Sequence, residues 1–501
     1  MTKQSGALDR RRFLRRSFGA SAAMLLGLPR EASAQQAPAS AAGRAMQQAD
    51  AKRVSALIAD FVTGFDIKAV PQPVIDRART VFIDTIGVML AGSHEDVSHL
   101  AVAMVKGEAS APQATVVGQS LRASQQLAAL ANGVASHAMD YDFTFMRGQA
   151  AAAVIPAILP VAEAAGATPA EMIAAYIIGA EVVARVVRAD QDGPLFDAWH
   201  TTGIVGGIGA AAACARLLKV PAAAIPDVVG IAASLASGFN ANFGTMSKPL
   251  HCGNAARNGV MAALLGKSGF TSNPAAIEGR HGYLNSIGRD LPVSIEAFKD
   301  LGRRYDLVEG RHRFKPYPCG GLTHTTIEAA LELRGKVGTR ISEIKSIHCF
   351  VARSAGQRAG TQYPSTVEAA KFSVGYLVPY ALIHGAPKIA AFTEKALQDE
   401  RLKALAVTVT ASVDPELGPG GDDSPARIRI TLADGQVLEQ RKDYASGSYR
   451  NPITPAQIQE KFLDCATQIM SADAARRIYA FLDTLPAQPS LDPLWPMLRK
   501  G

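Results

Sequence analysis

The sequence predicts a mainly α-helical protein that carries a smaller α+β domain, and two changes of pattern along the chain indicate this. From about Ala49 to Gly282 the chain is rich in alanine and repeats apolar residues at helical spacing. After about Val293, short segments of alternating β-branched residues lie among helical ones, and purely helical patterns return near the C-terminus. We therefore expect a helical domain at 49–285, an α+β domain at 286–446, and C-terminal helices at 447–490 that pack back on the helical domain.

Helix signals follow one another along the first domain. Apolar residues recur at helical spacing from Arg77 to Leu90, and Gly92 marks the end of that helix. Thr168-Pro169-Ala170-Glu171 is a capping box with proline at the first helical position, and Asn273-Pro274 predicts another short helix. Alanine and glycine are frequent and no strict heptad persists, so we expect a compact bundle rather than a coiled coil.

The second domain alternates strand and helix patterns. Three segments have β-branched alternation: Ile344–Val351, Val407–Val413 and Ile428–Leu432. Asp434-Gly435 predicts a hairpin turn before a further short strand that starts at Val437. Helical patterns cover Leu322–Leu333 and Val367–Ile383. A second capping box at Thr454 then precedes the last helices, Ile458–Met470 and Ala474–Leu485.

The N-terminus has the three parts of an export signal in order. Asp9-Arg10-Arg11-Arg12-Phe13-Leu14-Arg15 is a twin-arginine pattern, Phe18–Leu28 is apolar, and Ala32-Ser33-Ala34 is a cleavage site. We expect residues 1–34 to be a signal peptide read by the twin-arginine machinery, and 35–48 to be a disordered lead-in of a periplasmic protein. The apolar stretch is too short for a stable membrane anchor. The alternative is a basic tail on a cytoplasmic protein.

The composition excludes some classes of protein and of binding partner. The 501 residues are 48% hydrophobic and 19% charged, as in a large globular protein. The net charge is +8, yet no basic run with interleaved aromatics occurs, which argues against nucleic acid and suits a small anionic substrate. The five cysteines are widely spaced without a C-x-x-C pair, so we expect no zinc site, disulfide framework or iron–sulfur cluster.

Four clusters hold polar residues inside apolar segments. They are His137 to Thr144, Trp199 to Gly203, Lys248 to Gly253, and Lys315 to Gly321 with His324 after it. A site for a polycarboxylate needs fixed cations, a base beside the acidic C–H and an acid beside the leaving group. Taken singly, His137 and His251 are more often structural histidines, and Asp140 and Asp142 can cap a turn.

Together the clusters resemble the MmgE/PrpD family, over about residues 50–485. The resemblance rests on short motifs in the same order along the chain: Asp84-Thr85-Ile86-Gly87, Ala131-Asn132-Gly133 leading to His137 and Asp140, His200-x-Thr202-Gly203, Lys248-x-x-His251-x-Gly253, Lys315-x-Tyr317-Pro318-Cys319 and Ala370-Lys371-Phe372-Ser373.

The resemblance implies an all-helical main domain, a smaller α+β lid, a homodimer and a site between domain and lid. It implies action on small citrate-like or succinate-like acids without metal or organic cofactor. Site residues carried over are Asp140, Thr144, His200, Lys248 and Lys315, and Tyr363 is matched to a lid tyrosine.

Two positions depart from the family pattern. Phe143 replaces the last aspartate of an Asp-Phe-Asp-Asp-Thr run, and Gln149 stands where a His-Pro-Ser segment usually begins. That histidine belongs to the active site of dehydratase and decarboxylase members. Glutamine can hydrogen-bond but cannot shuttle a proton at neutral pH. Arg147 is close enough in sequence to serve as an extra carboxylate clamp.

These patterns predict a cofactor-independent lyase, of the dehydratase or decarboxylase type, that acts on a small di- or tricarboxylate by proton abstraction next to a carboxylate. We assign proton transfer to His200, an orienting role to Asp140, and carboxylate clamping to Lys248 and Lys315. Further substrate contacts are expected from Thr144, Arg147, Gln149, His251, Tyr317 and Tyr363. The alternatives are an isomerase or epimerase on a similar acid, and an exported binding protein without turnover.

Overall fold

The computed structural model describes residues 53–190, 198–287, 294–421 and 423–500. The predicted signal peptide (1–34) and lead-in (35–48) lie outside the described residues. Within the described part, no helix is both long enough and apolar enough to cross a membrane.

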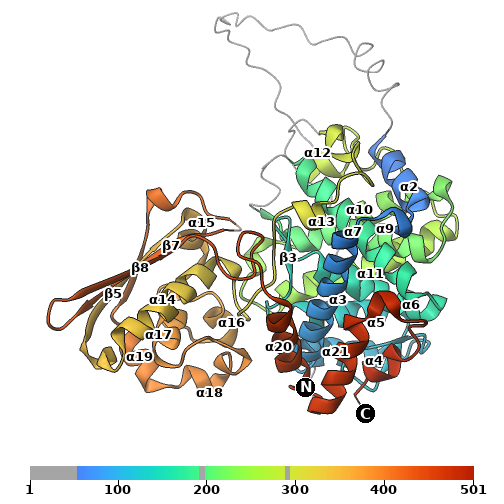
Figure 1. Ribbon diagram of the computed structural model, residues 1–501. Coiled ribbons are helices and arrows are strands. Elements are labelled where there is room, and N and C mark those ends of the chain that lie inside the picture. The colour runs from blue at the N-terminus through green and yellow to red at the C-terminus, as the bar shows by residue number, and fades with distance from the viewer. Residues whose placement is uncertain (1–52, 191–197, 288–293, 422, 501) are drawn as a thin grey trace, which may run out of the picture. The chain divides into compact units, whose positions relative to one another are not determined.

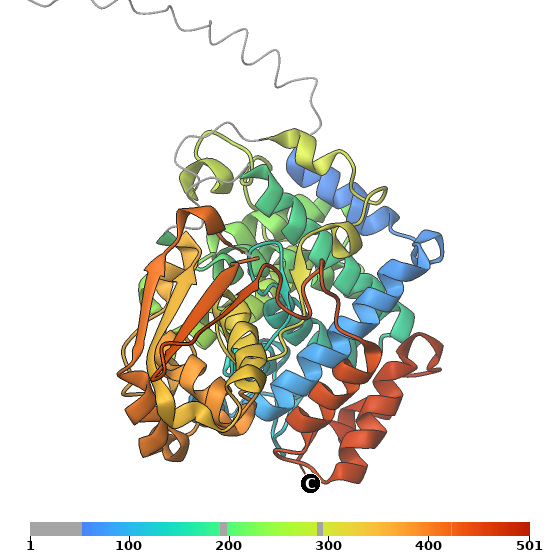
Figure 2. The same cartoon turned by 60° about the vertical axis from the view of Figure 1, so that its left-hand side comes forward.

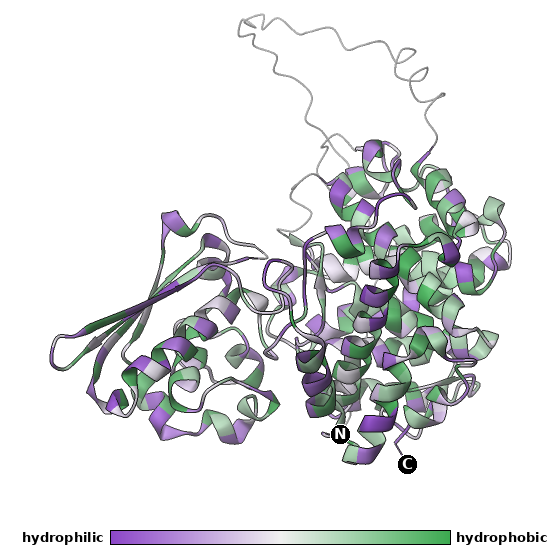
Figure 3. Cartoon of the chain, viewed as in Figure 1, coloured by the Kyte–Doolittle hydropathy of each residue, from purple (hydrophilic) through white to green (hydrophobic). Residues whose placement is uncertain are grey.

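The first part of the chain is a bundle of helices, which confirms the predicted mainly α fold (Figure 1). Its apolar side chains form one core, and Figure 3 shows hydrophobic residues concentrated in these helices. The helices longer than one turn are α2 (Val54–Gly64), α3 (Gln72–Gly92), α4 (Asp96–Gly107), α5 (Gln125–His137), α6 (Ala151–Ala165), α7 (Pro169–Ala189), α9 (Thr201–Leu217), α10 (Ile225–Ser234), α11 (Ser247–Lys267) and α12 (Tyr283–Ile287).

Small residues bring α5 and α11 into close contact. A Cβ added at Gly133 of α5 would lie 2.6 Å from the Cα of Gly253 in α11, closer than real Cβ contacts allow. The two helix backbones therefore meet where only glycine fits. This contact fixes the end of α5 beside the start of α11, and those two ends carry His137 and Lys248.

Local sequence signals explain several helix ends. The capping box at Thr168 is present, with Glu171 bonded back to the backbone N–H of Thr168 at 2.8 Å. The short helix predicted after Asn273 does not form. Instead, Asn273 accepts a hydrogen bond from the N–H of Ala275, and turns continue to Gly282, since Tyr283 N–H bonds the carbonyl of Ala276.

Two short strand pairs lie outside the predicted sheet. β1 (Ala114–Thr115) pairs with β2 (Arg122–Ala123), and β3 (Thr144–Phe145) pairs antiparallel with β4 (His312–Arg313). The main domain is therefore not all-helical, and two-residue strands are too short to show in the sequence pattern. The β3–β4 pair matters for function, because it joins the segment after Asp140 to the segment before Lys315.

The second part is an α+β domain with its own core. Its sheet has the order β6-β5-β7-β8, in which β5 and β6 are parallel and the other pairs are antiparallel. The strands are β5 (Ile344–Val351), β6 (Val409–Val413), β7 (Ala426–Leu432) and β8 (Val437–Lys442). The helices are α14 (His324–Val337), α15 (Arg353–Arg358), α16 (Val367–Ala370), α17 (Val374–Ile383), α18 (Glu394–Leu397) and α19 (Glu400–Ala406), and Figure 1 shows α14 and α17 beside one face of the sheet. The single-turn α13 (Asp306–Glu309) precedes this domain and packs on α3 and α7 of the helical bundle.

One predicted helix of this domain is broken, and the break shapes the site. The apolar pattern over 367–383 forms α16 and α17, with Lys371 to Ser373 between them. Ser373 caps α17 by accepting from the N–H of Tyr376, and the carbonyl of Lys371 accepts from the N–H of Gly320 at 2.9 Å. The break therefore holds Lys371 in a fixed turn.

The last helices lie against the helical bundle. α20 (Pro455–Ala466) and α21 (Ala472–Asp483) pack on α3, followed by the short α22 (Leu494–Met497), and Figure 2 shows them in red beside the blue α3. A Cβ at Gly87 of α3 would lie 2.9 Å from the ring of Phe462. Lys461 of α20 pairs with the buried Asp84 of α3 at 2.6 Å, so the C-terminal segment is anchored by both packing and charge.

Candidate active site

The site is built around a strained turn at Asp140. Helix α5 ends at His137, and Asp140 follows with a φ of 51°, a left-handed conformation that aspartate tolerates better than most residues. Its N–H bonds the carbonyl of His137 at 3.1 Å. Strain of this kind is kept where the surroundings fix it, and it often marks a functional position.

Two lysines converge on the Asp140 carboxylate. The Nζ atoms of Lys248 and Lys315 each lie 2.9 Å from Oδ1 of Asp140, and Lys315 also donates to the Asp140 carbonyl at 2.7 Å. All three side chains are buried. Burial alone would raise the pKa of Asp140, but the two ammonium groups hold it well below its usual range, so the carboxylate stays ionised.

Local structure explains how these lysines reach the turn. Lys248 lies in the first turn of α11, while Lys315 follows β4, which is paired with β3 just after Asp140. The hydroxyl of Tyr141 donates to the carbonyl of Pro316 at 3.1 Å, which ties the two segments together again. Asp140, Lys248 and Lys315 are therefore in mutual contact, but neither Lys315 nor His200 is among the described residues that line the pocket beside Asp140, so the predicted roles of all four stay predictions.

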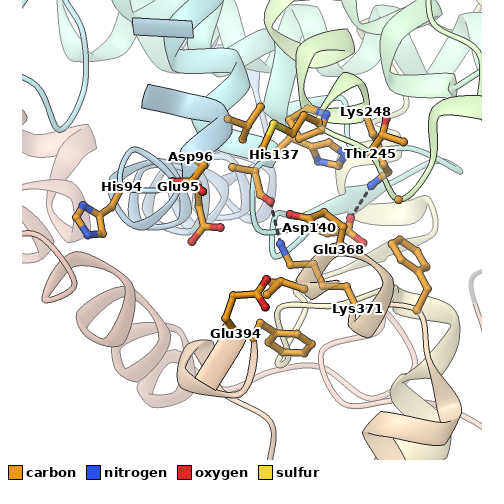
Figure 4. A pocket seen from close by; sticks show the side chains of 18 residues that line it. His94, Glu95, Asp96, His137, Asp140, Thr245, Lys248, Glu368, Lys371 and Glu394 are labelled. Atoms are coloured by element: carbon orange, nitrogen blue, oxygen red, sulfur yellow. Dashed lines mark hydrogen bonds and ion pairs between the residues drawn. The ribbon is translucent and has the colours of Figure 1, made fainter. Parts of the chain in front are cut away.

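A third lysine, which the sequence reasoning did not select, lies at the same turn. Lys371 is 6% exposed and donates to the carbonyl of Ala138 at 3.1 Å (Figure 4). No carboxylate among the described residues forms an ion pair with it. Burial lowers the pKa of Lys371, although the carboxylates of Glu95, Asp140 and Glu368 nearby partly oppose this shift. The only sequence signal was its place in the Ala370-Lys371-Phe372-Ser373 motif.

A pocket of about 240 Å³ opens beside these groups. The start of α4, the end of α5, the start of α11 and the lid segments near α16 and α18 contribute its walls. Asp140, Lys248, Lys371 and His137 line one part, and Glu95, Asp96, Glu368 and Glu394 line another (Figure 4). The pocket therefore lies between the helical domain and the α+β domain, where both contribute side chains.

Two histidines lie next to each other behind Asp140. The rings of His137 and His200 are stacked with centroids 5.5 Å apart, and Nδ1 of His200 lies 3.2 Å from Nδ1 of His251. Burial, with Lys248 and His137 nearby, lowers the pKa of His200 well below its usual range, and burial also lowers the pKa of His251. His200 is thus neutral at pH 7, the charge state that a general base requires, although it is not among the described residues that line the pocket.

His137 is held by a carboxylate. Its Nδ1 lies 2.9 Å from Oδ1 of Asp142, and both side chains are fully buried. The sequence reading of His137 as a structural histidine did not foresee that its ring also lines the pocket.

Gln149 faces the histidine segment through Thr202. The Thr202 hydroxyl donates to the Gln149 side-chain oxygen at 3.0 Å and accepts from the Gln149 N–H at 2.9 Å. Thr202 is the second residue after His200, so Gln149 is close to the predicted base. Thr144 lies in β3, and Arg147 is exposed with a left-handed backbone, and neither lines the pocket described above.

The two predicted tyrosine contacts lie in the lid core. Tyr317 packs edge-on against His324 at 5.2 Å, and Tyr363 packs against Tyr376 and donates its hydroxyl to the carbonyl of Leu397 at 3.0 Å. Neither residue lines the pocket at Asp140. Their substrate-binding role stays a prediction.

One group in the site has the spacing of metal ligands. Ligand atoms of His137, Asp140 and Asp142 all lie within 4.8 Å of one another. However, Oδ1 of Asp140 accepts from two ammonium groups and Oδ1 of Asp142 pairs with His137, so a cation would have to displace these partners. The surrounding lysines favour an anion at this place.

Models of one protein family match most of this chain. Residues 56–296 match the MmgE/PrpD N-terminal domain, and residues 317–486 match the MmgE/PrpD C-terminal domain. Similar proteins include cis-aconitate decarboxylase of Homo sapiens, 28% identical over 448 residues that cover 87% of this chain and 92% of the relative. The Mus musculus enzyme is 26% identical (87% and 91% covered), and that of Aspergillus terreus is 24% identical (89% and 96% covered).

Proposed function

The chain belongs to the MmgE/PrpD family and is an enzyme of the lyase type, and from that premise we propose that it removes carbon dioxide or water from a small di- or tricarboxylate. The relatives named above are cis-aconitate decarboxylases, and cis-aconitate is therefore the first candidate substrate. The pocket at Asp140 is the place where the reaction would occur.

The three lysine ammonium groups that gather around the Asp140 turn carry this proposal. Lys248, Lys315 and Lys371 converge there, and among the described residues only Asp140 forms ion pairs with any of them. A buried charge without a counter-charge is costly. Lys248 and Lys371 stand on the pocket wall, where each could bind one substrate carboxylate, and this favours a dicarboxylate or tricarboxylate over a monocarboxylate.

The geometry also suits the chemistry of such a lyase. Negative charge develops on the substrate carboxylate as the neighbouring bond breaks, and Lys248 and Lys371 on the pocket wall would stabilise it. His200 exchanges the proton in this proposal, while Asp140 orients Lys248 and Lys315 by accepting from both.

Gln149 favours a second candidate, a carboxylate-binding protein without turnover. The side-chain oxygen of Gln149 already accepts a hydrogen bond from Thr202, and a glutamine amide acts neither as an acid nor as a base at neutral pH. An isomerase or epimerase needs the same proton abstraction, followed by return of the proton to the same carbon.

A thermal-shift screen with product analysis tests the proposal. We expect succinate, citrate and cis-aconitate to raise the melting temperature, and butyrate, which has one carboxylate, to leave it unchanged. Proton NMR of the stabilising acids should then show loss of carbon dioxide or water. Binding without a product would favour the binding protein, and deuterium incorporated from D2O into an unchanged acid would favour the isomerase. No response to any polycarboxylate would refute the proposal.

We further propose export through the twin-arginine route and a homodimeric assembly. The first rests on the motif at Arg10 and Arg11 with the later cleavage site at Ala34, and the second rests on family membership.

A further inference from the structure

We infer that His137, held by Asp142, is a second proton-transfer residue of this site and acts together with His200. This inference rests on the proposed lyase function and adds a residue to it. Sequence patterns alone made His137 a structural histidine, because it ends an alanine-rich helix.

The Asp142 contact fixes which ring nitrogen carries the hydrogen. An ionised carboxylate only accepts hydrogen bonds, so Nδ1 of His137, 2.9 Å from Oδ1 of Asp142, carries the N–H. The lone pair is then on Nε2. A carboxylate that sets the tautomer of a neutral imidazole is the arrangement found in hydrolase triads.

The other nitrogen lacks a partner. Nε2 of His137 is buried and has no hydrogen-bond partner among the described residues, although buried polar atoms usually have one. The same ring lines the pocket together with Asp140 and Lys248 (Figure 4). An unsatisfied basic nitrogen at the wall of a pocket that also holds two lysines is a ready acceptor for a substrate proton.

The neighbourhood of His137 limits how many protons the two rings hold. Asp142 and Asp140 follow it in the chain, Lys248 and His251 face it from α11, and His200 is stacked on it from the start of α9. Because the ring centroids of His137 and His200 are only 5.5 Å apart, a charge on one ring disfavours a charge on the other. The pair therefore holds at most one proton in normal turnover.

Burial lowers the pKa of both His137 and His200, so both rings are neutral in the free protein, and the one proton that a dehydration needs enters from solvent when the acid binds. The neutral ring takes a proton from the carbon next to a carboxylate, and the C–H electron pair forms the C=C bond as the C–O bond breaks. The protonated ring gives its proton to the leaving hydroxide, which departs as water, so the pair again holds one proton. In a decarboxylation the C–C bond breaks, carbon dioxide leaves, and the electron pair left on carbon takes the proton from the protonated ring, which solvent then reprotonates.

The test changes the tautomer without removing the ring. In Asp142→Asn the amide can donate to Nδ1, which favours the tautomer with the hydrogen on Nε2. The corresponding change in a serine protease triad lowers kcat by about 10⁴. The assay uses the acid that the wild type converts. For both Asp142→Asn and His137→Gln we expect kcat to fall at least about 100-fold while KM changes only a few-fold. One limb of the pH profile of kcat should also disappear in both variants. His348→Gln on β5 is the matched control and should keep wild-type kcat and pH profile.

A measurement on the unmodified protein covers the case in which the variants fail to fold. Proton–nitrogen NMR of ¹⁵N-histidine-labelled wild type should show His137 with hydrogen on Nδ1 and a bare Nε2, and Nε2 should gain a proton when a dicarboxylate binds. A protonated Nε2 in the free protein would overturn the inference, as would variants that keep kcat and both limbs of the profile. If the wild type converts no acid at all, the proposed function fails as well, so the two failures are distinguishable.

Discussion

Replacing Lys371 by methionine separates a binding lysine from a structural one. Lys371 is 6% exposed and its ammonium has one backbone acceptor and no ion pair among the described residues. Methionine keeps the length of the side chain and removes the buried charge, which should stabilise the unliganded protein by about 1–3 kcal/mol. The Ala138 carbonyl loses its hydrogen bond, which reduces this gain by about 1 kcal/mol. Loss of one charge-assisted hydrogen bond of about 1.5–3 kcal/mol should weaken dicarboxylate binding about 10- to 150-fold.

Lys461→Met is the matched control. Lys461 is also 6% exposed, but it pairs with Asp84 at 2.6 Å and donates to the carbonyl of Tyr141 at 2.7 Å. Its removal leaves Asp84 buried and unpaired, so we expect a loss of about 3–5 kcal/mol in stability. Urea denaturation and isothermal titration with succinate measure both quantities. A Lys371→Met protein that is less stable than the wild type and binds the acid equally well would refute the reasoning.

Three further outcomes follow from the described residues and the sequence. Burial lowers the pKa of His312 to about 4, whereas a histidine in the unfolded chain titrates near 6.5, so the unfolded chain binds more protons as the pH falls below about 6.5. The free energy of unfolding should therefore fall by about 2 kcal/mol between pH 7.5 and pH 5 because of this residue. A urea midpoint that does not change with pH, or that changes as steeply in His312→Gln, would contradict this. Gln149→His should create or raise decarboxylase or dehydratase turnover, and an inactive but folded variant would show that this departure is not what limits activity. Lysine at both Arg10 and Arg11 should abolish recovery from the periplasm on cell fractionation, and unchanged recovery would exclude the twin-arginine route.

Periodicity and capping predicted most of the fold because long elements have strong signals. The capping boxes at Thr168 and Thr454 start α7 and α20, and the strand predicted at Ile344–Val351 is β5 with the same ends. Two-residue strands such as β3 have no measurable period, and the turns after Asn273 depend on hydrogen bonds that no pattern encodes.

The site was predicted in part for a similar reason. Asp140, Lys248 and Lys315 were found because each stands in a polar cluster of its own. Lys371 was missed because it lies inside an apolar helical pattern, and only the structure shows the break between α16 and α17 that turns it toward Ala138. The surroundings of His137 could not be predicted, because they depend on a contact with Asp142, five residues further on, and on the His200 ring stacked from another segment.

A crystal structure with the acid that stabilises the protein most tests the central claim most directly. The claim is that the lysines around the Asp140 turn hold the carboxylates of a small polycarboxylate. We predict one carboxylate within hydrogen-bond distance of Lys371 and another within reach of Lys248 or Lys315, with the carbon between them facing the His137 and His200 rings. An acid bound with none of its carboxylates on these three lysines would contradict the account.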